Sequence, residues 1–110
     1  MSDYNQKFRS IQRKFLNSID VRVARMREAL ELFASGKTTD RSKLHLLIHD
    51  FTGNAAMLEL HEIALEARKA LNIFEGSEEA QNQEATGWIE EIGGSLDRVV
   101  ILKEKHEALK

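Results

Sequence analysis

The chain of 110 residues is long enough for one domain with its own core and too short for two, so we predict a single domain over residues 1–110. It has no cysteine, which excludes disulfides, thiolate metal sites and cysteine nucleophiles. Its net charge is −2, and its basic residues are interleaved with acidic ones, which argues against a nucleic-acid partner.

Helices are expected almost throughout, because the chain has no proline and its apolar residues recur every three or four positions. The spacing predicts a first helix through residues 4–15 and a second through residues 19–33. Ser18 lies between them and is a suitable N-cap for the second. Ser35 and Gly36 are expected to end that helix.

Three further helices are expected after a polar connector, KTTDRS. Thr39 or Asp40 is the predicted N-cap of a helix whose apolar positions span residues 44–58. Another follows over residues 60–74, and a last one runs from Ser77 to the C-terminus. The segments predict an all-α fold, an antiparallel four-helix bundle with up-down-up-down topology and an additional N-terminal helix across one end.

His49 stands apart from the apolar residues of its helix. On a helical wheel these residues centre about 200° away from it, so we expect the imidazole to face water. A glycine four positions later removes a side chain that would crowd the ring. The pattern indicates an accessible nucleophile or ligand on a rigid helix. The predicted neighbours on the same side are Ser42, His45, Thr52, Gly53 and Ala56.

The stretch HDFTGNAAML, residues 49–58, resembles the motif of the histidine phosphotransfer (HPt) domains of bacterial two-component phosphorelays. In that family a phosphoacceptor histidine precedes a glycine and a run of small residues on one helix of a four-helix bundle. The resemblance extends more loosely to FLNSIDVRVARMREAL and ALEARKALN. Thr52 stands where many members carry a lysine, and Glu59 where many carry a glycine.

The resemblance implies that His49 is the phosphoacceptor of a domain that relays a phosphoryl group between receiver-domain aspartates. Such a domain is a phosphoryl carrier rather than a self-sufficient enzyme. The implied partner is the receiver domain of a response regulator or of a hybrid histidine kinase, which would hold the Mg²⁺, while the HPt-like domain binds no metal or other cofactor and acts as a monomer. The residues expected around the phosphoryl group are Thr52, Gly53, Asn54 and Ala56, and those expected to dock the partner are Ser42, His45 and Leu46.

Other interpretations stay open. The same fold could bind a receiver domain without phosphotransfer, and Thr52 in place of the usual lysine would then mark the loss of that activity. The chain could also serve as a self-associating helical adaptor. His45 and His49 lie one turn apart and could bind Zn²⁺ or Ni²⁺, although the sequence indicates no third ligand. No apolar run approaches the roughly 20 residues that span a bilayer, and MSDYNQKFRS lacks the apolar segment of a signal peptide, so we expect a cytoplasmic protein without a membrane partner.

Overall fold

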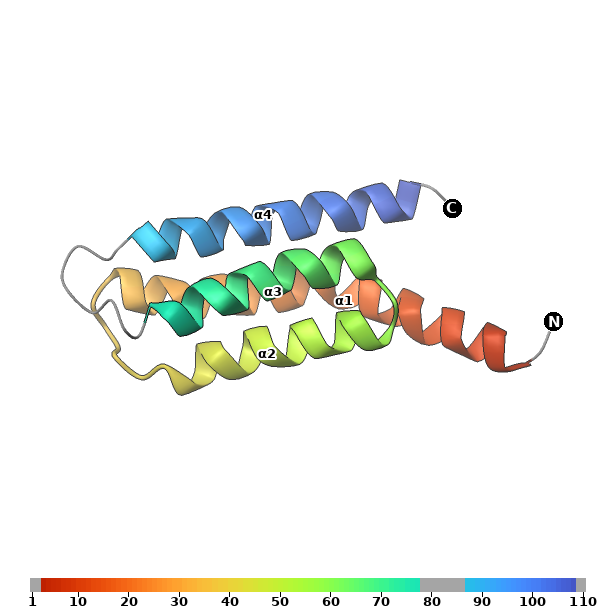
Figure 1. Ribbon diagram of the computed structural model, residues 1–110, viewed down its shortest axis with the longest axis horizontal. Coiled ribbons are helices and arrows are strands. Elements are labelled where there is room, and N and C mark those ends of the chain that lie inside the picture. Colours follow the sequence, from red (N-terminus) through yellow and green to blue (C-terminus); the bar gives the residue numbers. More distant parts are fainter. Residues whose placement is uncertain (1–2, 78–86, 109–110) are drawn as a thin grey trace.

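The structure is a computed structural model that describes residues 3–77 and 87–108. These residues form four helices and the segments that connect them. The helices are α1 (Asp3–Ala34), α2 (Ser42–Met57), α3 (His61–Gly76) and α4 (Gly87–Ala108). Successive helices run in opposite directions (Figure 1), and contacts join each helix to the next and α4 back to α1. The predicted all-α, up-down-up-down four-helix bundle is therefore confirmed.

One hydrophobic core runs through the bundle, built from residues spaced three or four apart on each helix. Fully burying one large apolar side chain stabilises the fold by about 1.5–3 kcal/mol. Because these side chains must face the core, they set the rotation of each helix about its axis. The core includes Phe15, Leu16, Ile19, Val23 and Met26 of α1, Leu44, Ile48, Phe51 and Ala55 of α2, Ile63, Ala67, Ala70 and Phe74 of α3, and Ile92, Leu96 and Val99 of α4.

Helix α1 is continuous over 32 residues, so the predicted break at Ser18 and the separate N-terminal helix across one end are wrong. The Ser18 hydroxyl donates to the Phe15 carbonyl at 2.7 Å, within the helix, instead of capping a new one. Phe15 and Ile19 are both buried and lie four residues apart, so the apolar stripe passes Ser18 without interruption. The N-terminal part of α1 extends beyond the other helices at the end where α2 joins α3 (Figure 1).

Gly36 ends α1 as predicted. Its φ of +74° lies in the left-handed region, which glycine adopts without steric cost. The N–H of Gly36 donates to the Phe33 carbonyl at 3.1 Å, and the N–H of Lys37 donates to the Leu32 carbonyl at 2.9 Å. This pair of bonds is a Schellman motif, which satisfies carbonyls at the end of the helix.

The turn from α2 to α3 has the same motif without a glycine. The N–H of Glu59 donates to the Ala56 carbonyl, and that of Leu60 to the Ala55 carbonyl, each at 3.0 Å. Glu59 has a φ of +60°, and a left-handed conformation costs a residue with a side chain about 1–2 kcal/mol. The buried Leu60 helps to hold this turn, which places α3 directly against α2.

The start of α2 differs from the predicted N-cap. Arg41 occupies the N-cap position, without a side-chain capping bond. Asp40, one of the two predicted caps, accepts a hydrogen bond from the Ser42 N–H at 2.9 Å, and this bond lowers the pKa of the Asp40 carboxyl. Thr39 does not cap the helix.

The predicted segment over residues 60–74 corresponds to α3. Ser77 directly follows α3, where its N–H donates to the Ile73 carbonyl at 3.0 Å, so it does not begin the last helix as predicted. That prediction also covers residues 78–86, which lie outside the described residues. The described part of the last helix begins at Gly87.

A buried carboxylate joins α3 to α4. Glu66 is 6 % exposed, and its carboxylate accepts a hydrogen bond from Arg98 Nε at 2.7 Å. Burial by itself raises the pKa of Glu66, but the Arg98 bond and charge, with Lys69 at 3.6 Å, outweigh it and hold this pKa below its ordinary value.

The described helices include none that is both long enough and apolar enough to cross a membrane.

Candidate functional site on helix α2

Helix α2 has a buried face and an exposed face. The ring of Phe51 on the buried face packs against the ring of Phe15 on α1, with centroids 5.3 Å apart. Since the core sets the rotation of α2, the side chains opposite it point to solvent. The buried face consists of Leu44, Ile48, Phe51, Thr52 and Ala55. What we call the outer face consists of the exposed residues Ser42, Leu46, His49, Gly53, Ala56 and Met57.

His49 lies near the middle of this outer face, exposed as the sequence predicts. Its ring stacks on that of His45, one turn earlier, with centroids 5.9 Å apart and planes inclined by 29°. Among the described residues, no hydrogen bond or ion pair holds the His49 side chain. Its imidazole is thus open to an approaching molecule.

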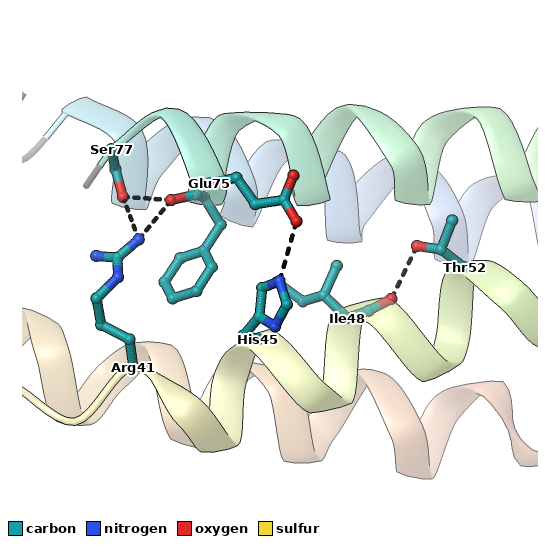
Figure 2. A network of polar contacts seen from close by, with 7 residues as sticks. Arg41, His45, Ile48, Thr52, Glu75 and Ser77 are labelled. Atoms are coloured by element: carbon teal, nitrogen blue, oxygen red, sulfur yellow. Dashed lines mark hydrogen bonds and ion pairs between the residues drawn. The ribbon is translucent and has the colours of Figure 1, made fainter. Parts of the chain in front are cut away.

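His45 is fixed by contacts to α3. Its Nε2 lies 2.9 Å from Glu75 Oε2, with 44 % of the His45 side chain and 50 % of the Glu75 side chain exposed (Figure 2). The ring also contacts that of Phe74, with centroids 6.2 Å apart. An exposed ion pair contributes about 0–1 kcal/mol to stability, so its main effect here is to orient the His45 ring.

Arg41 ties the start of α2 to the end of α3. Its guanidinium lies 4.1 Å from the centroid of the Phe74 ring and donates to the Phe74 carbonyl and to Ser77 Oγ, at 2.5 and 2.9 Å (Figure 2). These bonds satisfy groups at the C-terminal end of α3. A cavity of about 480 Å³ lies beside this contact and extends to the His45 side chain; it is lined by Arg41, Ser42, His45, Phe74 and Glu75.

Thr52 is not on the outer face, contrary to the prediction. It is 2 % exposed, and its hydroxyl donates to the Ile48 carbonyl at 2.8 Å, one turn earlier (Figure 2). On the helix it lies about 40° from Ile48 and about 60° from His49, so it sits at the edge of the core-facing stripe. The hydroxyl that was expected beside the imidazole is therefore bonded inside the bundle.

Gly53 and Ala56 lie on the outer face, where the prediction placed them. A Cβ added to Gly53 would meet no atom of the described residues within 4 Å outside the nearby backbone of its own helix, so packing among these residues does not require glycine there. Asn54 is half-buried and lies about 140° around the helix from His49, off the outer face. Ser42 and Leu46, two of the predicted docking residues, are both exposed on it, Leu46 by 60 %.

A comparison with known protein families identifies the family of this chain. The family model of the Hpt domain matches residues 10–109, nearly the whole chain. The chain belongs to the Hpt domain family. Hpt domains carry out histidine phosphotransfer in two-component signalling and interact with receiver domains. A search of curated proteins and a search of solved structures each returned no match.

Sequence reasoning missed the contribution of α3 to the site of this Hpt domain. Glu75 and Phe74 contact His45 from α3, and Arg41 binds the end of that helix. In the sequence, Glu75 directly follows the helix predicted over residues 60–74, and no pattern there links it to His45. A contact between side chains of two helices depends on their relative rotation and register, which no local pattern encodes.

No group of three His, Asp or Glu side chains within residues 3–77 and 87–108 is placed to hold a metal ion. The pair formed by His45 and His49 thus has no third ligand among these residues.

Proposed function

We propose that His49 is the phosphoacceptor of this Hpt domain and that the domain, as a cytoplasmic monomer, relays a phosphoryl group between receiver-domain aspartates. The observation that carries the proposal is the position of His49, exposed on the outer face of a helix whose opposite face is locked into the core. Gly53 and Ala56, on the same face, add little bulk beside it. A rigid helix that presents an uncrowded imidazole suits an in-line transfer between two proteins.

The transfer needs a nucleophile from this chain. In the neutral His49 ring, one nitrogen carries a lone pair and the other carries the proton. The lone pair attacks the phosphorus of an aspartyl phosphate, a nitrogen–phosphorus bond forms, and the bond from phosphorus to the aspartyl oxygen breaks. The aspartate leaves as a carboxylate with that electron pair, and attack by the aspartate of a second receiver reverses the step.

The partner supplies the rest of the chemistry. Phosphoryl transfer depends mainly on positioning and on neutralising the charge of the transferring group. We assign that charge neutralisation to Mg²⁺ in the receiver domain, which also carries the aspartate. The Hpt domain then contributes the nucleophile and a surface that brings it in line.

The outer face of α2 is the proposed docking surface. Leu46 is 60 % exposed and Met57 is 71 % exposed, and they lie on this face with Ser42 around His49. His45 borders the same surface, half-buried. A contact that must form and dissociate in each transfer suits a small interface, below about 1,200 Å².

Transfer of radiolabelled phosphate tests the proposal. Receiver domains charged from labelled acetyl phosphate are mixed with the Hpt domain and Mg²⁺, and the chain is examined for acid-labile, base-stable label. We expect label on the wild type and none on His49→Gln. The matched control is His61→Gln, which removes an exposed histidine at the start of α3 and should keep the label. Label that persists in His49→Gln would refute the assignment.

A second function is favoured by one observation. Thr52 offers no cation, and its hydroxyl is bonded to the Ile48 carbonyl, so this position does not assist a phosphoryl group on His49. A binding module that docks a receiver domain without chemistry, or a helical adaptor, is compatible with this feature. Saturable receiver binding without label on any histidine would select the binding module.

A further inference from the structure

The ring that stacks on His49 is held in place by a carboxylate from another helix. Glu75 Oε2 lies 2.9 Å from His45 Nε2, and the centroids of the His45 and His49 rings are 5.9 Å apart. Three side chains thus follow one another across the surface, from Glu75 on α3 to His45 and then to His49 on α2. The ion pair exists when the His45 ring carries both of its protons.

A phosphoryl group on His49 would change the charge balance at this surface. It brings about −1.5 to −2 charges at neutral pH. Asp50, the next residue, is exposed and already negative. A cation within a few ångströms favours the phosphorylated form by the same Coulomb attraction that stabilises any charged group beside an opposite charge.

Within α2 itself, Ser42–Met57, no lysine or arginine shares the side of the helix that carries His49. Lys43 is exposed, but it sits about 120° around α2 from His49. Lys69 on α3 forms an ion pair with Glu66 at 3.6 Å. Thr52 carries no charge and is buried. His45 is the ionisable ring in direct contact with His49.

We propose that His45, oriented by Glu75, is a positioning residue that stabilises the phosphoryl group on His49, an inference that rests on the proposed function. When the His45 ring carries both of its protons, the carboxylate of Glu75 accepts from Nε2–H, and Nδ1–H remains a second donor. In that form a positive ring lies beside the site of the modification. The domain thereby obtains from the preceding turn of α2, with help from α3, the charge that position 52 does not supply.

Direct chemical charging tests this inference without a receiver domain. Phosphoramidate transfers its phosphoryl group to exposed imidazoles, and phosphorus NMR follows the signal that is absent in His49→Gln. The quantity measured is the rate at which this signal decays. We expect His45→Gln to speed the decay about two- to fivefold, the range of an exposed charge pair. His45→Arg restores a cation and should return the decay to near the wild-type rate.

Further variants separate a charge effect from a structural one. Glu75→Gln should fall between wild type and His45→Gln, because it removes the charge that orients the ring. Lys43→Gln, which removes an exposed positive charge from the same helix, should leave the decay unchanged. Equal decay in wild type and His45→Gln, or equal acceleration in His45→Gln and His45→Arg, would overturn the inference. Charging of His49 by phosphoramidate without transfer from any receiver would instead count against the relay alone.

Discussion

The two faces of α2 have different roles: the buried face packs in the core and stabilises the fold, and the outer face presents His49. On the buried face, Phe51, Thr52 and Ala55 are at most 2 % exposed, and even the threonine hydroxyl is bonded inside the helix. On the outer face, His49 and Gly53 are exposed, and within residues 3–77 and 87–108 no side chain lies within 4 Å of a Cβ added to the glycine. Substitutions on the first face should therefore change folding, and substitutions on the second should change phosphotransfer.

The largest effect on folding is expected on the buried face. Phe51→Ala removes a ring that packs on Phe15 at 5.3 Å and leaves a cavity, so we expect the free energy of unfolding to fall by about 3–5 kcal/mol. Urea denaturation followed by circular dichroism measures it. Met57→Ala, at a side chain that is 71 % exposed, should cost less than about 0.5 kcal/mol. Similar losses in the two variants would contradict the division between faces.

The same contrast holds on α3, where Glu66 is buried and Glu75 is exposed. Arg98→Ala removes the partner of the buried carboxylate and should cost about 1–3 kcal/mol at neutral pH. In the wild type the lowered pKa of Glu66 contributes stability above its ordinary pKa, and this is lost as pH falls through the lower folded value. In the variant burial prevails and raises that pKa, so the difference in stability should shrink on acidification. A pH series of urea denaturation checks this, and a difference independent of pH would disprove it.

Substitution of Gly53 on the outer face should raise the stability of the fold instead of lowering it. Gly53→Ala places a methyl group where no atom lies within 4 Å, so we expect it to stabilise the fold by about 1 kcal/mol through helix propensity. Gly36→Ala is the matched control, because the φ of +74° at that position should make the same substitution destabilising. Thermal denaturation distinguishes the two signs. A loss of stability in Gly53→Ala would mean that the glycine serves the fold rather than access to His49.

The smallest effect is expected at the end of α2. Glu59→Gly relieves a left-handed conformation with a φ of +60° and should raise stability by about 0.5–1 kcal/mol, the net of relieved strain and the entropy that glycine adds to the unfolded chain. Gly36 shows the arrangement that the variant should reach, since it occupies the same place in the same motif. Unchanged or lower stability in calorimetry would show that the turn holds Glu59 without strain.

Periodicity predicted much of this fold, and it erred where a local signal was ambiguous. The positions of the helices and the outward direction of His49 follow from the 3.6-residue repeat of apolar side chains. Ser18 resembles an N-cap in sequence, yet its hydroxyl satisfies a carbonyl of its own helix, because the buried stripe through Phe15 and Ile19 continues across it. Thr52 lies between the two faces on the wheel, so packing alone decided which way its hydroxyl turned.

The sequence by itself determined that α2 has two faces, that His49 lies on the exposed one and that a glycine and an alanine accompany it. These features depend on the spacing of residues along one helix, which is a local property. Only the tertiary structure decided that Glu75 meets His45 and that Arg41 binds the end of α3. Such contacts require two helices to adopt one rotation and one register, and the packing of the whole core selects both.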